Sequence, residues 1–341
     1  MKGRLDHIHG LRGLAALAVV FQHAAIMVQN GGHAYFRPLL DLINLGRFGV
    51  ALFFMISGVI IPFSFKGTRP IRNFLIARVF RLFPAYWLSI PLLALAGVAA
   101  RGMHYDAVQI LANTTMLQWF FGIPDVGFGY WTLRYEVLFY LLSALLFWRG
   151  PLDREHTSEI SAALCLFVAA APVLLGGYST LTFFYIALFF LGIVLRRAMI
   201  DQCPVARRWA VWLVPIALAV AVLVSGVFVR VAENAFIPVV PLTMAMTLPI
   251  VVLVAVLHLR PVSPAWLMGL GTISYSLYLF QDISLLFLPF VVSPSQWPLG
   301  YVVLAIGGTV AVASLIWHVL EKPMIALGRR LTAADSRIQL A

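Results

Sequence analysis

Five ionisable side chains lie inside long apolar stretches of the sequence. They are Arg12, His23, Arg134, Glu136 and Asp282. A charge in a hydrocarbon environment is unfavourable by several kcal/mol, so it is retained where it is paired, solvated or used by the protein. Each of the five is therefore a candidate for a functional site.

Arg12 and His23 are spaced so that one helix would carry both on the same face. Their separation of eleven residues returns an α-helix to within about 20° and advances it by about 16 Å. Arg12 would then lie at a membrane interface, where a guanidinium can hold phosphate, and His23 about half-way through the apolar core. A ligand with a phosphorylated head and a long arm would span them. Taken singly, Arg12 also fits a membrane anchor and His23 a structural histidine.

Arg78 and Arg81 form a second basic pair, three residues apart in the segment RVFRLFPAYW. Residues at this spacing share one face of a helix, and two guanidinium groups on one face suit a phosphate ligand. Membrane topology alone would also place arginines at a cytoplasmic helix end.

Glu136 lies within the segment GYWTLRYEVLFY, with Tyr140 one helical turn later. Arg134 is two residues away and points to another face, so we expect the partner of Glu136 on a different helix, with His23 as the candidate. A carboxylate beside a histidine orients the ring and raises its basicity, as general-base activation of a hydroxyl requires. A purely structural ion pair is the alternative.

The segment GTISYSLYLFQ supplies further polar groups to an apolar stretch. Ser274, Tyr275 and Tyr278 could line a polar cavity together with Gln281 and Asp282. Serine and tyrosine also serve as hydrogen-bonding links between membrane helices, so both interpretations stay open.

The elements that must position these residues are membrane helices. Hydrophobic residues make up 62% of the 341 positions and charged residues 11%, against about one-quarter charged in a soluble domain. Apolar blocks near the ~20 residues of a membrane-spanning helix predict an all-α integral membrane protein with about ten transmembrane helices. The predicted spans are 10–29, 46–65, 83–100, 130–148, 160–176, 180–196, 210–229, 238–257, 267–290 and 299–320.

Three further features complete the organisation. Residues 108–122 are apolar but short and polar-rich, which predicts an interfacial or re-entrant helix, while GVALFFMISG predicts close helix packing through small residues. Most of the 24 Lys and Arg fall in alternate loops, which places the N- and C-termini in the cytoplasm. We therefore expect one membrane domain over residues 1–325 and a short polar cytoplasmic tail over 326–341.

Several other function classes are disfavoured. The net charge of +11 comes from short loops without interleaved aromatic residues, which argues against nucleic-acid binding. Cys165, Cys203 and the histidines show no metal-ligand spacing, so no metal site is expected. Walker A, dinucleotide and G-x-S-x-G motifs are absent from the sequence.

Read together, the motifs resemble the acyltransferase-3 family of membrane O-acetylases, over nearly the whole chain. The carrying segments are GLRGLAALAVVFQH, GVALFFMISG, RVFRLFPAYW, WTLRYEVLFY, ISYSLYL and the closing Glu321 and Pro323, in the family's order. Three positions depart from the pattern: His9 replaces a frequent Asp, Ala51 a common polar residue, and Gln281 a frequent His. We expect these departures to bear on substrate choice.

The resemblance implies transfer of an acyl group, acetyl first, from cytoplasmic acyl-CoA to a hydroxyl of a cell-surface or lipid-linked sugar. Acyl-CoA would be a co-substrate, with no tightly bound cofactor, and the location would be the bacterial inner membrane. His23 would be the catalytic base or a transient acyl carrier, and Glu136 would orient His23 or the acceptor.

The resemblance also distributes the binding roles. Arg12, Arg78 and Arg81 would hold the donor. The residues expected to bind the acceptor are Trp131, Tyr140, Ser274, Tyr275 and Tyr278.

Two other classes of function remain as alternatives. A transporter or flippase for a lipid-linked saccharide would also carry buried charges, but inverted repeats and paired broken helices are not visible in the sequence. A membrane scaffold would leave the burial of His23 and Glu136 without a reason.

Overall fold

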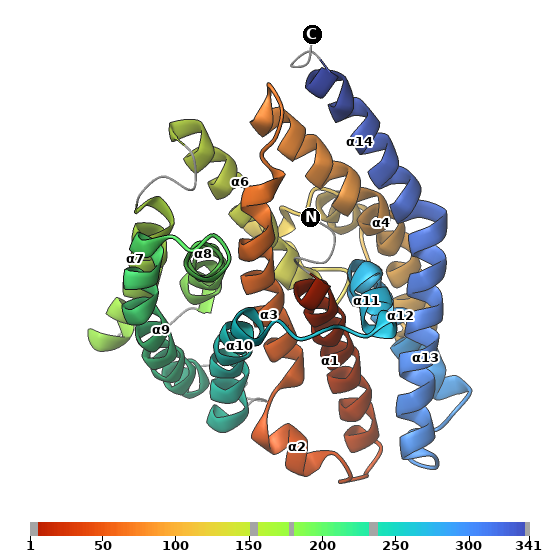
Figure 1. The fold of residues 1–341 in the computed structure, drawn as a ribbon. Helices are drawn as coiled ribbons and strands as arrows, with labels where there is room; N and C mark the ends of the chain where they lie inside the picture. The colour runs from red at the N-terminus through yellow and green to blue at the C-terminus, as the bar shows by residue number, and fades with distance from the viewer. Residues whose placement is uncertain (1–5, 151–155, 177–180, 232–237, 338–341) are drawn as a thin grey trace. The chain divides into compact units, whose positions relative to one another are not determined.

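The computed structural model describes residues 6–150, 156–176, 181–231 and 238–337, and every regular element in these ranges is a helix (Figure 1). The chain divides into two compact units. The first comprises Met1–Gln22, Ala34–Pro62 and Phe139–Gly271, and the second comprises His23–His33, Phe63–Leu138 and Thr272–Ala341. The division falls within three α-helices, α1 (Asp6–Asn30), α6 (Leu133–Arg149) and α11 (Ala265–Thr272), and within the 3-10 turn η1 (Ile61–Ser64).

The first unit is built around one buried helix. Besides parts of α1 and α6, its helices are α2 (Arg37–Leu42), α3 (Leu45–Ile60), α7 (Thr157–Leu174), α8 (Leu181–Met199), α9 (Pro204–Val231), α10 (Val239–Leu259) and α11 (Ala265–Thr272). Helix α8 contacts α3, α7, α9 and α10. A helix that is apolar on all sides is expected in such a central position, and 83% of the α8 span is buried.

Small residues let α3 and α8 approach closely, as predicted for the segment GVALFFMISG. A Cβ atom on Gly58 would collide with the backbone carbonyl of Phe189 and lie 3.1 Å from the Cα of Gly192. A Cβ atom on Gly192 would in turn collide with the carbonyl of Met55. The prediction of close packing through small residues is confirmed.

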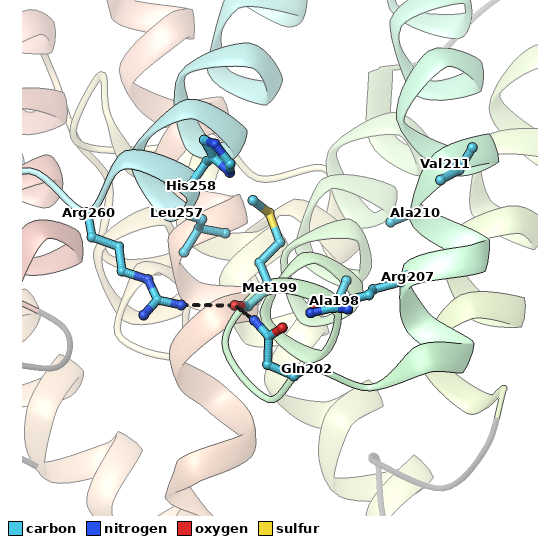
Figure 2. Close-up of a pocket in the computed structure, with 9 residues that line it drawn as sticks. All are labelled: Ala198, Met199, Gln202, Arg207, Ala210, Val211, Leu257, His258 and Arg260. Atoms are coloured by element: carbon cyan, nitrogen blue, oxygen red, sulfur yellow. Dashed lines mark hydrogen bonds between the residues drawn. The ribbon is translucent and has the colours of Figure 1, made fainter.

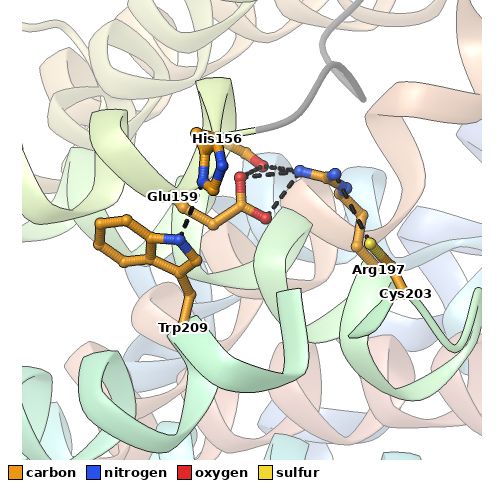
Figure 3. A network of polar contacts seen from close by, with 6 residues as sticks. His156, Glu159, Arg197, Cys203 and Trp209 are labelled. Atoms are coloured by element: carbon orange, nitrogen blue, oxygen red, sulfur yellow. Dashed lines mark hydrogen bonds and ion pairs between the residues drawn. The ribbon is translucent and has the colours of Figure 1, made fainter. Parts of the chain in front are cut away.

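A buried ion pair joins α7 to the end of α8 (Figure 3). Nη1 of Arg197 lies 2.6 Å from Oε1 of Glu159, and the two side chains are 5% and 0% exposed. Ser158 accepts a further hydrogen bond from the same nitrogen at 3.1 Å. Removing one partner of such a pair leaves an uncompensated buried charge, at a cost of about 3–5 kcal/mol. Arg197 therefore belongs to the interior of the first unit.

The second unit contains the remaining helices. They are α4 (Pro70–Arg101), α5 (Ala107–Asn113), α12 (Ser274–Phe287), α13 (Pro298–Ile316) and α14 (Lys322–Arg337), with the turns η2 (Gln118–Phe121), η3 (Tyr130–Thr132) and η4 (Leu288–Phe290) and the π-helical turn η5 (Trp317–Glu321). Helix α12 packs against α4 and α13, and α14 packs along α4. The close approach of α14 to α4 depends on Gly328, where a Cβ atom would lie 2.8 Å from Phe80.

The helical membrane architecture is confirmed, and the number of spans differs from the prediction. Within the described residues, seven helices are long and apolar enough to cross a membrane, and α11 with α12, interrupted at Ile273, form an eighth if counted together. Helix α3 is apolar but has 16 residues, and α6 has 17 residues and three charges, so neither is one of these seven helices. Ten spans and cytoplasmic termini therefore stay predictions.

Two predicted segments take a definite form. Residues 108–122 fold into α5 and η2, which are too short to cross a membrane. The expected polar tail begins inside α14, which runs to Arg337, and residues 338–341 lie outside the described part of the chain.

Candidate active site

A chain of hydrogen bonds in the second unit fixes the ring of His23. Nδ1 of His23 lies 3.0 Å from Oε1 of Gln281, and Nε2 of Gln281 donates to the backbone carbonyl of Tyr278 at 3.1 Å. A carbonyl can only accept, so the amide nitrogen of Gln281 must face Tyr278 and its oxygen must face His23. The amide oxygen is itself only an acceptor, so Nδ1 of His23 carries the proton.

This arrangement leaves Nε2 of His23 as the basic nitrogen. A neutral imidazole protonated on Nδ1 keeps its lone pair on Nε2. The ring is half-buried, and in the described residues no hydrogen bond to Nε2 is formed. The lone pair can therefore accept a proton from a bound hydroxyl.

The buried carboxyl group of Asp282 lies in the same region and interacts electrostatically with His23. Its side chain is 7% exposed, Oδ2 accepts a hydrogen bond from the backbone N–H of Phe128 at 3.1 Å, and its charge acts on His23. A nearby carboxylate stabilises the imidazolium that forms when a histidine takes up a proton. Asp282 can therefore support general-base chemistry without a hydrogen bond to the ring.

Glu136 lies in the first turn of α6, where the helix dipole favours a negative charge. Its charge acts on the hydroxyl of Tyr275 from α12. We expected Glu136 to be the partner that orients His23, whereas the ring donates its hydrogen bond from Nδ1 to the amide oxygen of Gln281. A role of Glu136 in catalysis stays a prediction.

The hydroxyl groups of two predicted acceptor-binding tyrosines hold the second unit together. Tyr275 donates to the carbonyl of Leu82 on α4 at 3.0 Å. Tyr278 donates to the carbonyl of Gly129 at 2.8 Å and lies 2.7 Å from Oγ1 of Thr132. The alternative interpretation, hydrogen-bonding links between elements, is thus confirmed for both hydroxyls. Contact with a substrate stays a prediction.

The other predicted acceptor-binding residues are distributed over both units. Ser274 is fully buried at the start of α12. Trp131 meets Tyr135 edge to face, with ring centroids 6.2 Å apart, in the second unit. Tyr140 belongs to the first unit, where its ring lies 6.4 Å from that of Phe139.

The predicted phosphate-binding arginines lie on helices, as expected. Arg12 and His23 are both in α1, and Arg78 and Arg81 are both in α4. Arg78 donates to Oγ of Ser64 at 2.5 Å, and Arg81 is half-buried. The helical spacing assumed for both pairs is therefore present, and their contact with a phosphate stays a prediction.

The loop before α6 holds one more carboxylate, the half-buried Asp125. Burial raises the pKa of Asp125, against the lowering effects of a hydrogen bond from Gln118 at 2.6 Å and of the charge of Arg134. The guanidinium of Arg134 also lies 4.8 Å from the ring centre of Trp119. The guanidinium of Arg134 thus interacts with side chains of this loop. This placement agrees with the prediction that Arg134 faces away from Glu136.

The sequence analysis named Asp282 as a candidate charge and placed Gln281 and Asp282 in a possible polar cavity, but it assigned neither residue a role at His23. Asp282 carried a signal, because it is a charge in an apolar stretch, and Gln281 carried a weaker one, because it departs from the family pattern. The hydrogen bond between Gln281 and His23 joins positions 258 residues apart, so local spacing in the sequence does not indicate it.

Comparison with known proteins decides the family. The sequence profile described as an acyltransferase domain matches residues 5–318. This protein belongs to the acyltransferase-3 family. The acyltransferase is also 25% identical, over 368 residues, to Nodulation protein 10 of Rhizobium leguminosarum bv. viciae, and the alignment covers 97% of this chain and 96% of that relative. No solved structure matches the chain.

Membership of this family agrees with the helical architecture. The acyltransferase is a multi-pass membrane protein and an O-acyltransferase by its family. The resemblance drawn from the motifs is thereby confirmed.

Proposed function

We propose that this acyltransferase lies in the bacterial inner membrane and transfers an acyl group from acyl-CoA to a hydroxyl of a cell-surface or lipid-linked sugar. Acetyl is the acyl group we propose. The observation that carries the proposal is the His23–Gln281–Tyr278 chain, which leaves Nε2 of His23 as a free base. Family membership supplies the type of reaction.

In the proposed reaction, Nε2 of His23 accepts the proton of the acceptor hydroxyl as its oxygen attacks the thioester carbonyl carbon. The tetrahedral intermediate then collapses with cleavage of the C–S bond. The thiolate of CoA leaves and takes the proton back from the imidazolium, so His23 ends neutral. Asp282 stabilises the imidazolium in between, and Glu136 orients the acceptor from the start of α6.

The donor would be held by arginines. A guanidinium matches the geometry of phosphate oxygens, and acyl-CoA carries phosphates at the end of a long arm. We assign this role to Arg78 and Arg81, with Arg12 on α1 at a distance of about 16 Å along the helix from His23. Trp131, Tyr140, Ser274, Tyr275 and Tyr278 are the proposed surroundings of the acceptor.

Donor binding can be tested by release of free CoA thiol from acetyl-CoA in purified enzyme supplied with a glycan or glycolipid acceptor. We expect Arg78→Gln and Arg81→Gln each to raise the KM for acetyl-CoA by about tenfold or more, the loss of one charged hydrogen bond. Arg329→Gln, an exposed arginine on α14, is the matched control and should leave the KM unchanged. An equal change in all three variants would contradict the assignment.

The role of His23 as a base can be separated from that of an acyl carrier. With labelled acetyl-CoA and no acceptor, a base leaves the protein unlabelled, whereas an acyl carrier leaves acetyl on His23. We expect no label on the wild-type chain. Label that is present in wild type and lost in His23→Ala would establish the carrier instead.

A further inference from the structure

A basic cavity of about 510 Å³ lies in the first unit, where α8 ends, α9 begins and α10 ends (Figure 2). This volume is within the ~300–1,000 Å³ typical of small-molecule sites. Its polar lining consists of Gln202, Arg207, His258 and Arg260. None of these residues has a part in the proposed acyl transfer.

Each arginine of the basic cavity uses only part of its hydrogen-bonding capacity on the protein. Arg207 donates from Nε to the carbonyl of Ala198 at 3.1 Å, and Arg260 donates from Nη2 to the carbonyl of Met199 at 3.1 Å. In Figure 2 the two arginines lie on either side of Met199. Both side chains are exposed, and within the described residues neither forms an ion pair.

These contacts explain how the arginines are held but leave most of their donors unused. The carbonyls of Ala198 and Met199 form the C-terminal end of α8, which favours positive charge. A guanidinium has five N–H donors, so one bond to a carbonyl leaves four on each arginine. Two guanidinium groups beside one cavity are the donor set that a phosphate group accepts.

The backbone at the basic cavity is strained. Gln202 has φ of 59° and Arg260 has φ of 48°, two of the four left-handed residues other than glycine in the described chain. This conformation is unfavourable by roughly 1–2 kcal/mol for a residue with a Cβ atom, and glycine would relieve it. Both strained positions carry side chains that line the cavity, so the strain accompanies a particular placement of polar groups.

The wall of the basic cavity changes from polar to apolar along α9 and α10. Ala210, Val211 and Leu257 complete the lining on this side. Val211 is 67% exposed and the adjoining Leu259 is 73% exposed, on two helices that are candidate membrane spans. A ligand that fits has an anionic head and a hydrocarbon tail.

We propose that the basic cavity binds the phosphate headgroup of an anionic phospholipid. Arg207 and Arg260 hold the phosphate, Gln202 and His258 contact the rest of the headgroup, and one acyl chain lies on the apolar surface of α9 and α10. Basic pockets between membrane helices are suited to such lipids, and the predicted cytoplasmic side is where the charge of this chain gathers.

Binding can be measured with the full-length protein in neutral detergent, by native mass spectrometry and by thermal unfolding during titration with phosphatidylglycerol. We expect phosphatidylglycerol to bind and raise the unfolding temperature, and phosphatidylcholine and inorganic phosphate to do neither at the same concentrations. The double variant Arg207→Gln/Arg260→Gln should weaken binding by about tenfold or more. Arg208→Gln, the adjacent exposed arginine outside the cavity, should leave it unchanged.

The double variant Arg207→Lys/Arg260→Lys keeps both positive charges and should retain much of the binding. It therefore distinguishes the loss of charge from a loss of fold caused by removing the arginine hydrogen bonds to the α8 carbonyls. Equal binding of phosphatidylcholine would overturn the proposal in favour of a purely apolar surface. Equal stabilisation by inorganic phosphate would overturn it in favour of a soluble anion. An equal loss in Arg208→Gln would show general surface charge instead of a site.

Discussion

The protonation of His23 depends on a side chain that takes no direct part in the proposed reaction. The backbone carbonyl of Tyr278 can only accept a hydrogen bond, so it orients the amide of Gln281 with its nitrogen toward Tyr278. The amide oxygen of Gln281 then faces His23 and keeps the proton on Nδ1. Gln281 is therefore a positioning residue, and its effect should be visible in the dependence of activity on pH.

Replacing Gln281 tests this directly. We expect Gln281→Ala to lower kcat by about 10- to 100-fold with little change in the KM for the acyl donor, as loss of an orienting partner does at other sites. Gln281→Glu should keep the orientation and move the pH–activity profile to higher pH, because an adjacent carboxylate stabilises the imidazolium. The control is Gln29→Ala, an exposed amide at the end of α1, the helix that carries His23. Unchanged pH profiles in both Gln281 variants would disprove the positioning role.

Asp125 gives a pH-dependent prediction at the level of stability. Its folded-state pKa is raised by burial above the ordinary value of 3.8, so the stability it contributes when protonated is lost as pH rises through that raised pKa. Asp125→Asn accepts the same hydrogen bond and stays neutral. Its unfolding temperature should fall less than that of wild type as pH rises from 3.8. A parallel dependence in the two proteins would contradict the shift, and Asp41→Asn, at an exposed ion pair, serves as control.

At the residue scale, the sequence was informative where a charge stands in an apolar stretch. Arg12, His23, Glu136 and Asp282 were found in this way. Gln281 is uncharged, and an amide is tolerated in many membrane helices, so its type alone did not distinguish it.

At the element scale, side-chain hydrogen bonds position the helices of the second unit, and close contacts between small residues position helices of the first unit. In the second unit, α12 contributes Tyr275 and Tyr278, which bond to α4 and to the turn before α6, as well as Gln281 and Asp282 beside His23. In the first unit, Gly58 sets the distance between α3 and α8.

A pair of identical substitutions tests the importance of close helix packing. Gly58→Ala places a Cβ atom on the carbonyl of Phe189 and should destabilise the protein by about 1–3 kcal/mol. Gly226→Ala in α9 meets no atom within 4 Å and should stabilise it by about 0.4–1 kcal/mol through lower chain entropy. Thermal unfolding in detergent measures both changes. Similar effects of the two substitutions would show that the α3–α8 contact is not tight.

At the element scale, apolar block length predicted most helices, because burial in hydrocarbon dominates their placement. The interruption at Ile273 and the π-helical turn at Trp317–Glu321 were not predicted. Glu321, the last residue of the π-helical turn, accepts a hydrogen bond from Ser276 on α12, and local spacing carries no sign of that contact. The burial of Arg197 was not predicted either, because its partner Glu159 lies on another helix.

At the scale of the whole molecule, the predicted orientation of the chain follows from the distribution of Lys and Arg. The orientation can be tested by introducing single cysteines into a Cys165→Ala/Cys203→Ser background and labelling them with a membrane-impermeant maleimide. We expect Gln296→Cys, in the turn before α13, to react in intact cells, and Arg329→Cys, on α14, to react only after permeabilisation. The reverse pattern would place the C-terminal helix on the outer side.

The central claim is acyl transfer by His23, and the most direct measurement follows labelled acetyl from acetyl-CoA into glycan or glycolipid in membranes. Wild type and His104→Ala, an exposed histidine with no part in the proposed site, should incorporate label equally. His23→Ala, at equal expression, should incorporate about 100-fold less label or lower still, because a general base contributes a factor of this size to the rate. Equal incorporation by His23→Ala and wild type would contradict the account.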